Sequence, residues 1–289
     1  MPSTPPARPE HVRDQVREHD FGVVNKPLTR WERIYGNGLV RKAFILAVLA
    51  GIWQGYAMYL ANPLILPTFL ETLQSFLQRV GNGELIRKAG VSMKVLLWGY
   101  GIGLASALVV TILAMTSRLG NDLLETLTAM LNPLPAIALL PLALIWLGLG
   151  NASIVFVLVH AVMWPIALNT HSGFQGVSPT LRMVGRNYGL GGFGYIRQII
   201  LPAAFPYILA GLNIGWAFAW RTLIAAELVF GTTSGSGGLG WFIYENKNVL
   251  DIPAVFAGLF TVILIGLLVE NLFFRIVEER TVRRWGMQS

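Results

Sequence analysis

The sequence is dominated by long apolar segments that contain almost no charge. These segments lie at residues 43–60, 91–115, 123–147, 153–169, 205–230 and 254–274. A helix that crosses the hydrocarbon core of a bilayer needs about 20 predominantly apolar residues. Only 13% of the residues are charged and 54% are hydrophobic, whereas about a quarter of a soluble domain is charged. The sequence therefore predicts an all-α membrane protein with six transmembrane helices.

Lysine and arginine are distributed unevenly among the segments that connect the predicted spans. If the N-terminus lies in the cytoplasm, the inner segments hold 16 of these residues and the outer segments hold five, with Arg221 inside a span. Basic residues collect on the cytoplasmic side of membrane proteins, so we expect both termini in the cytoplasm. This bias accounts for the net charge of +7, and we expect no nucleic-acid partner. The absence of cysteine excludes disulfides and thiolate metal sites.

Three regions outside the spans have a distinct character. The predicted N-terminal tail, residues 1–42, is proline-rich and then basic, and its end forms an interfacial helix if Trp31 and Tyr35 lie at headgroup level. Residues 68–80 have apolar side chains at helical spacing and predict an amphipathic surface helix. The predicted transmembrane domain spans residues 43–277, and residues 278–289 form a cytoplasmic tail. The polar start, which extends through Lys42, favours an uncleaved first span over a signal peptide.

The longest charged interruption in the second half of the chain is the loop at residues 179–202. In this loop, nine residues separate Gly189 from Ile199, and Leu201-Pro202 follows. This spacing resembles the EAA loop of binding-protein-dependent ABC importer permeases, which has Glu-Ala-Ala, three residues, Gly, nine residues and Ile-x-Leu-Pro. The Glu-Ala-Ala triplet itself is replaced here by Met183, Val184 and Gly185.

Further segments resemble the nitrate, taurine and aliphatic-sulfonate branch of that family, from about Ile65 to Val277. They are ILPTFLETLQSFLQ after the first span, LNPLPAIALLPLALIWLGLGN in the third, LPAAFPYILAGLNIGWAFAWRTLIAAEL through the fifth, and SGSGGLGWFI in the outer loop.

The resemblance implies a type I ABC importer permease fold in the bacterial cytoplasmic (inner) membrane. It implies a homodimer of this chain, two ABC ATPase subunits below it, and a periplasmic or lipid-anchored substrate-binding protein above. We expect no cofactor in this chain, with ATP and Mg²⁺ bound by the ATPase subunits, and no enzymatic activity of its own. The solute would be a small anion such as a sulfonate, nitrate or a carboxylate. The residues assigned to ATPase coupling are Arg182, Met183, Val184, Gly185, Gly189, Ile199, Leu201 and Pro202.

Two ionisable residues, Arg221 and Glu227, lie within the fifth predicted span. Such residues usually face protein or a water-filled cavity, and a separation of six positions does not suit a pair on one helix face. They either line a path for an anionic solute, pair with another helix, or reach toward the headgroups. The residues assigned to the translocation path are Arg221, Glu227, Trp220, Pro135 and Asn169.

Other patterns argue against alternative activities. His160 is expected to bond across helices, while Asn169 and His171 lie near a span end, and no metal-ligand spacing is present. Gly235, Gly237 and Gly240 form a GxGxxG-like spacing without a preceding strand, and a turn at the membrane edge is the better interpretation. No GxxxxGK[ST] motif occurs. An ion-coupled carrier would show internal repeats, and a membrane enzyme would need a convergent acid/base or metal site.

Overall fold

The computed structural model describes residues 36–230 and 237–283, and every regular element in these ranges is helical. The chain divides into two compact units, Met1–Gly51 and Ile52–Ser289. The elements, with short 3₁₀ or π turns written as η, are α2 Gly38–Leu60, α3 Phe69–Gly81, α4 Glu84–Thr116, α5 Arg118–Leu131, η1 Ala136–Leu139, α6 Leu140–Leu147, α7 Asn151–Gln175, α8 Pro179–Asn187, α9 Gly192–Tyr195, η2 Ile196–Ile200, α10 Leu201–Phe230, α11 Leu239–Asn248, α12 Ile252–Leu268, η3 Val269–Phe274, α13 Arg275–Glu278 and η4 Glu279–Arg283.

Five helical segments of the described chain are long and apolar enough to cross a bilayer. They contain five of the six predicted spans. The remaining predicted span, 123–147, is divided between α5 and the η1–α6 segment, which meet at an angle of 90°. Pro133 and Pro135 lie at this break, where proline supplies no backbone N–H to continue a helix. Counting the bent pair as one span gives six.

Several helices extend beyond their predicted limits. The helix α4 begins at Glu84 rather than Val91, because the backbone N–H of Glu84 donates to Asn82 Oδ1 and Glu84 pairs with Arg79. The helix α7 continues to Gln175 rather than ending at Asn169. The helix α11 has no counterpart among the predictions. Trp31, Tyr35 and residues 231–236 lie outside the described residues.

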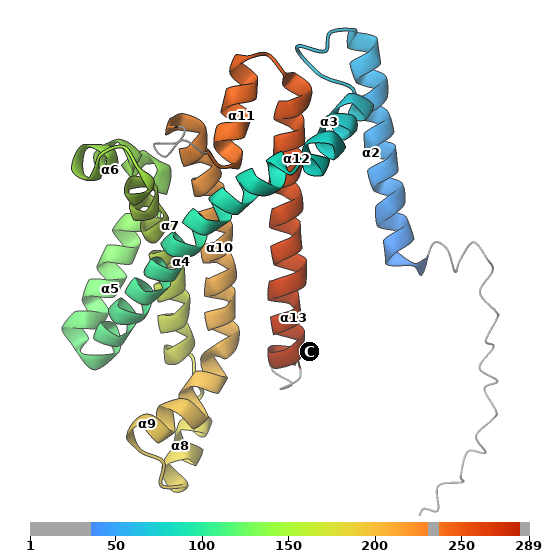
Figure 1. Ribbon diagram of the computed structural model, residues 1–289. Coiled ribbons are helices and arrows are strands. Elements are labelled where there is room, and N and C mark those ends of the chain that lie inside the picture. The colour runs from blue at the N-terminus through green and yellow to red at the C-terminus, as the bar shows by residue number, and fades with distance from the viewer. Residues whose placement is uncertain (1–35, 231–236, 284–289) are drawn as a thin grey trace, which may run out of the picture. The chain divides into compact units, whose positions relative to one another are not determined.

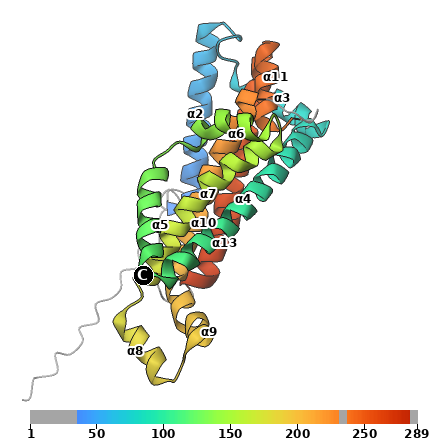
Figure 2. The ribbon, with the colours of Figure 1, turned by 90° about the vertical axis from the view of Figure 1, so that its left-hand side faces the viewer.

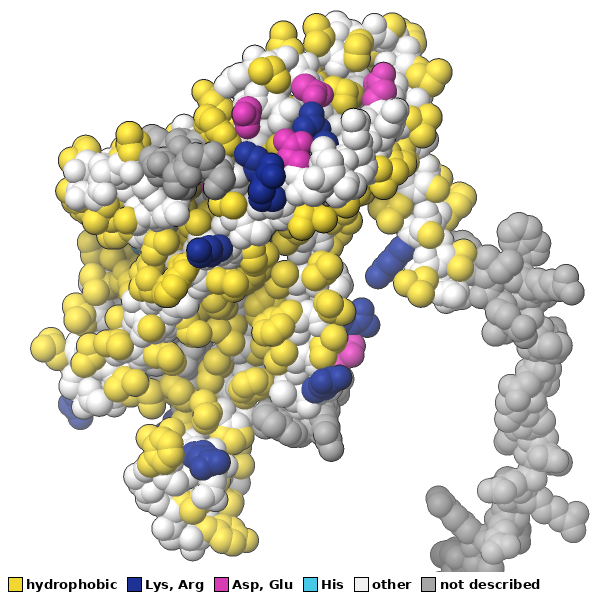
Figure 3. All heavy atoms as spheres, in the orientation of Figure 1, with side chains coloured by type: hydrophobic (Ala, Val, Ile, Leu, Met, Phe, Trp, Pro, Cys, Tyr) yellow, Lys and Arg dark blue, Asp and Glu magenta, His cyan; other side chains and the backbone are white. Residues whose placement is uncertain are grey.

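The predicted amphipathic helix at residues 68–80 is confirmed as α3. Its N-terminus has a capping box, in which Thr68 Oγ1 accepts from the N–H of Glu71 and Glu71 Oε2 accepts from the N–H of Thr68. At its other end Arg79 donates 2.7 Å hydrogen bonds to Glu84 and to Asp251. Figure 3 shows acidic and basic side chains gathered over α3 and its neighbours, above a predominantly hydrophobic surface.

The centre of the second unit is α7, which packs most extensively against α10 and α4. A Cβ atom at Gly99 of α4 would lie 2.5 Å from Leu158 Cβ, and one at Gly103 would lie 2.7 Å from Val162 Cβ. On the α10 side, a Cβ at Gly211 would lie 2.9 Å from Asn169 Cβ. Small residues allow this close approach of membrane helices. Figures 1 and 2 show α8 and α9 at the end of this bundle remote from α6 and α11.

We predict that Gly103→Leu lowers the thermal stability of the purified subunit because the added side chain collides with Val162. Overpacking of a filled site typically costs about 1–3 kcal/mol. Gly101→Leu is the matched control, since nothing lies within 4 Å of a Cβ at Gly101. Thermal unfolding in the same detergent compares the two variants, and equal unfolding temperatures would show that the α4–α7 contact is not close-packed.

Candidate functional site

The loop at residues 179–202 is folded into three consecutive short elements, α8, α9 and η2. The first begins where Ser178 Oγ accepts from the N–H of Leu181 and Pro179 occupies the first turn. Between α8 and α9 the chain turns at Gly189, whose φ of +71° lies in the left-handed region that glycine adopts without strain. We call residues 179–200 the coupling segment.

Within the coupling segment, α8 packs closely against η2 through a glycine. A Cβ atom at Gly185 would lie 2.8 Å from Tyr195 Cε2 and 2.9 Å from Ile199 Cγ1. Gly185 stands at the last position of the Glu-Ala-Ala pattern, and the methyl group of an alanine there would require the Tyr195 ring and the Ile199 side chain to shift. The contact joins two predicted coupling residues, Gly185 and Ile199.

The outer surface of the coupling segment is apolar and basic. Met183 is 56% exposed, Tyr188 81% and Phe193 77%, and Arg186 and Arg197 are exposed beside them. Figure 3 shows hydrophobic and basic side chains on this end of the visible face. Exposed large apolar side chains clustered in this way are typical of a protein contact surface.

Arg182 differs from the other arginines of the coupling segment because its guanidinium group is directed inward. Its Nη2 donates to the carbonyl of Phe174 at 2.7 Å, and its Nε donates to the carbonyl of Val177 at 3.1 Å. These carbonyls belong to the last turn of α7 and the connection that follows it, where backbone oxygens lack helical partners. Arg182 thus ties α8 to α7.

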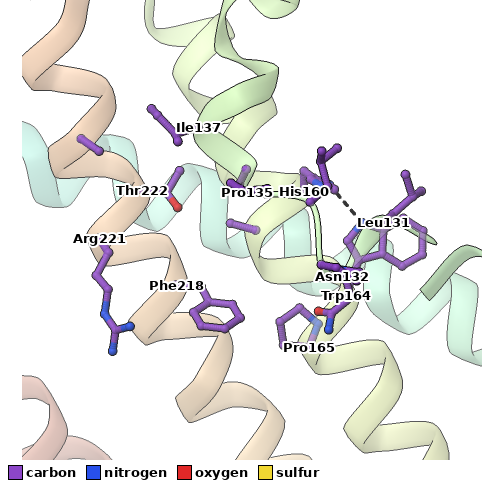
Figure 4. A pocket seen from close by; sticks show the side chains of 15 residues that line it. Leu131, Asn132, Pro135, Ile137, His160, Trp164, Pro165, Phe218, Arg221 and Thr222 are labelled. Atoms are coloured by element: carbon purple, nitrogen blue, oxygen red, sulfur yellow. Dashed lines mark hydrogen bonds between the residues drawn. The ribbon is translucent and has the colours of Figure 1, made fainter. Parts of the chain in front are cut away.

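A cleft of about 390 Å³ lies where α7, α10 and the break between α5 and η1 meet. Two of the five predicted path residues, Pro135 and Arg221, line it, together with His160, Trp164 and Thr222. Figure 4 shows that Arg221 lies at one side of the cleft, with its guanidinium extending away from Pro135 and Ile137. His160 was expected to bond across helices, but its hydrogen bond lies within α7, where Trp164 Nε1 donates to His160 Nδ1 at 3.0 Å.

The remaining predicted path residues lie elsewhere. Trp220 is buried against α12, where a Cβ at Gly266 would lie 3.5 Å from its Nε1. Asn169 donates from Nδ2 to the carbonyl of Pro165 at 2.7 Å, a bond within α7. The sequence does not show that Trp220 and Asn169 lie away from the cleft while Arg221 lines it. The packing of neighbouring helices determines which face of a helix lines the cleft.

Glu227 is 2% exposed and fixes the start of α11. Its carboxylate accepts from Ser92 Oγ at 2.8 and 2.9 Å and from the N–H of Gly240 at 2.9 Å. The same Ser92 hydroxyl oxygen accepts from the N–H of Leu239 at 2.8 Å. Since Ser92 belongs to α4 and Glu227 to α10, this cluster joins three helices. Sequence reasoning missed it because its members are 135 positions apart.

His171, expected at the end of a span, is buried and its Nε2 lies 2.7 Å from Asn121 Oδ1 of α5. No group of three or more histidine, cysteine, aspartate or glutamate side chains gathers at ligand distance within the ranges 36–230 and 237–283.

A charge within a membrane span costs about 2.5–3.5 kcal/mol on insertion scales. Arg221 is exposed on the described chain and has neither a hydrogen bond nor an ion pair within it. The carboxylate of Glu227, by contrast, accepts hydrogen bonds from Ser92 Oγ and from the N–H of Gly240. The two charges of α10 thus face different surroundings, one an open cleft and the other a closed cluster.

Comparison with known proteins gives the class to which this arrangement belongs. Residues 99–283 match the family described as the binding-protein-dependent transport system inner membrane component. A putative ABC transporter permease of Methanocaldococcus jannaschii is 32% identical over 84% of this chain and 91% of its own length. A nitrate import permease of Synechocystis sp. is 32% identical over 86% of this chain and 91% of its own. The taurine transport system permease of Escherichia coli is 29% identical over 78% and 82%.

The chain belongs to the family of inner-membrane components of binding-protein-dependent transport systems. It is an ABC transporter permease, a multi-pass protein of the bacterial inner membrane. The predicted membership of this family is thereby confirmed.

We predict that Glu227→Ala loosens α11, because it leaves the Ser92 hydroxyl and the Gly240 N–H buried without their acceptor. An orphaned buried group costs about 1–3 kcal/mol, so amide exchange in residues 239–248 should accelerate roughly tenfold or more. Glu245→Ala is the control within the same helix, since Glu245 is exposed and its one ion pair, with Lys88 Nζ, is long at 3.8 Å and therefore weak. Unchanged protection in Glu227→Ala would contradict this role.

We predict that Arg182→Gln releases α8 from α7, because glutamine is too short to reach both carbonyls. Loss of two hydrogen bonds from a charged donor should accelerate amide exchange in residues 179–188 by roughly tenfold. Arg186→Gln, which removes an exposed arginine four positions away, serves as the control and should leave exchange unchanged. If both variants exchange alike, the inward bonds of Arg182 do not hold α8.

Proposed function

We propose that this chain is the permease subunit of an ATP-driven importer for a small anionic solute, driven through the coupling segment. Two copies of the chain would form the translocation path. Two ABC ATPase subunits would bind the cytoplasmic side and carry ATP and Mg²⁺, and a soluble or lipid-anchored binding protein would deliver the solute from outside. The chain itself would catalyse no reaction.

The observation that carries the proposal is the build of the coupling segment. Its outer surface presents Met183, Tyr188 and Phe193 with basic side chains between them, which suits a groove on a partner protein. Its inner side is held by Gly185 and Arg182. A surface that is both exposed and firmly supported can receive force and transmit it.

The orientation of the chain is part of the proposal. The excess of lysine and arginine assigns 179–200 and both termini to the cytoplasm. The tails at 1–42 and 278–289 would then flank the transmembrane domain on the side where the ATPases bind. The opposite end of the second unit, with α3 and α11, would face the binding protein.

The solute class rests on the relatives and on the charge of the cleft. Relatives that cover most of this chain are named for nitrate, taurine and aliphatic sulfonates. All three have small oxyanion groups, and Arg221 on this chain provides a positive charge beside the cleft. A cationic group at this depth favours an anion over a cation.

The test is uptake by proteoliposomes that contain this chain with its ATPase subunits and binding protein. Radiolabelled nitrate, taurine and an alkanesulfonate are tested in turn. We expect uptake of one of these anions only when ATP is present on the side of the membrane where the ATPase subunits bind. We further predict that Gly189→Val reduces uptake several-fold. A left-handed conformation costs an L-residue about 1–2 kcal/mol, and a β-branched one more.

Gly189→Asn is the matched control, since asparagine tolerates the left-handed region and nothing lies within 4 Å of a Cβ at this position. It should retain uptake, and both variants should insert in the membrane at wild-type amounts. Uptake driven by an ion gradient without ATPase subunits would instead identify an autonomous carrier. Normal uptake by Gly189→Val would remove the turn at Gly189 from the mechanism.

A further inference from the structure

The cleft between α7 and α10 has a charge beside it whose counterpart the described residues do not supply. Arg221 lies about 30 Å along α10 from Leu201, at 1.5 Å per residue, and eight positions before Val229, where the candidate span ends. It is exposed at the side of the cleft, and no described residue forms a hydrogen bond or ion pair with it. A guanidinium group at such a depth needs a polar or anionic neighbour.

Glu227, the other ionisable residue of α10, cannot serve as that neighbour. Six positions separate it from Arg221, which places the two side chains about 120° apart around the helix. Its carboxylate is buried and bonded to Ser92 and to Gly240. The positive charge at the cleft is therefore not neutralised from within α10.

The other polar side chains of the cleft supply hydrogen-bond donors. Asn132 and Thr222 line it, and their side chains form no hydrogen bond within the described ranges. His160 accepts from Trp164 through Nδ1, so its neutral ring carries the proton on Nε2 and can donate through that atom. None of the described residues that line the cleft is acidic.

We propose that this cleft is an oxyanion subsite of the permease itself, which takes the sulfonate, nitrate or carboxylate group of the solute in transit. The inference rests on the proposed function for the solute class. Arg221, whose guanidinium extends from one side of the cleft, would attract the oxyanion through its planar pair of N–H donors, and Asn132, His160 and Thr222, which line the cleft, would supply further donors from its walls. A volume of about 390 Å³ accommodates a small organic anion.

The chain contains no cysteine, so a single introduced thiol reports on this cleft alone. Ala225 lines the cleft and lies four positions after Arg221, on the same face of α10. The full chain with Ala225→Cys is reconstituted in phosphatidylcholine nanodiscs. Its thiol is then labelled with two water-soluble reagents of similar size, sulfonatoethyl methanethiosulfonate and trimethylammonioethyl methanethiosulfonate, which carry opposite charges.

We expect the ratio of the anionic to the cationic reaction rate to be about tenfold higher than for free cysteine, because positions four apart on a helix are neighbours and the positive charge of Arg221 attracts the anionic reagent. The ratio of the two rates cancels any effect of Arg221 on thiolate formation. Arg221→Gln in the same background should bring the ratio close to that of free cysteine, whereas Arg221→Lys should keep most of the preference. Nitrate or taurine in millimolar excess should reduce the preference by occupying the site.

Arg118→Gln is the control for loss of one positive charge, since Arg118 is exposed and lies outside the cleft lining, and it should leave the ratio unchanged. A ratio unaffected by Arg221→Gln overturns the proposal. So does a preference for the cationic reagent, which would reveal a carboxylate from a second copy. Labelling only after denaturation would mean that lipid or a second copy covers the cleft, and it also overturns the proposal.

The labelling needs no ATPase and no binding protein, so its outcome is separate from the uptake test. A lasting anion preference in a chain that does not support ATP-driven uptake would support the subsite and contradict the proposed function. ATP-driven uptake without an anion preference at Ala225→Cys would support the proposed function and contradict the subsite.

Discussion

The fold depends on how closely α7 is held by the two helices beside it. Leu158 and Val162 of α7 occupy positions where Gly99 and Gly103 of α4 have no side chain. On the other side, a Cβ at Gly215 of α10 would lie 3.1 Å from Ile166 Cγ1. Because apolar side chains gain little by leaving lipid for protein, such packing is the principal source of affinity between membrane helices. The glycines therefore provide the space into which the side chains of α7 pack.

This arrangement also explains how α10 keeps two opposite charges apart. Its glycine-bearing face is closed by α7, which leaves the faces with Glu227 and Arg221 to meet different neighbours. Glu227 is enclosed by α4 and the start of α11, where three hydrogen bonds replace the water it has lost. Arg221 lies at the side of the cleft that the break after Leu131 and η1 also line.

The features that the sequence predicts well are those with a local cause. Long apolar runs identify the spans, and apolar side chains at helical spacing over residues 68–80 identify α3. The position of the break at Pro133 and Pro135 follows from missing backbone donors, but its 90° angle depends on packing that no local pattern encodes. The helix α11 was missed because Leu239–Asn248 mixes glycine, polar and aromatic residues without a clear apolar stripe.

The candidate site shows the same limit. The position of the coupling segment follows from its charge and glycine spacing, yet Arg182 and Arg186 are alike in sequence and differ only in the folded chain. Arg182 turns inward because the last carbonyls of α7 lie within reach of its guanidinium. Likewise, Pro135 and Arg221 share the cleft while Trp220, one residue before Arg221, faces α12. Such distinctions depend on helix rotation, which neighbouring helices set.

These contacts make α7 the helix that connects the coupling segment to the cleft. Arg182 bonds the coupling segment to its last turn, and its middle carries His160, Trp164 and Pro165 along the cleft. Pro165 is the cleft-lining residue of α7 nearest the coupling segment, and its ring removes one backbone hydrogen bond from the helix. Asn169 adds a side-chain bond to the carbonyl of Pro165, which supports the helix on the side of the coupling segment. Movement of α8 would therefore be carried rigidly as far as Asn169 and would bend α7 most easily at Pro165, where the wall of the cleft begins.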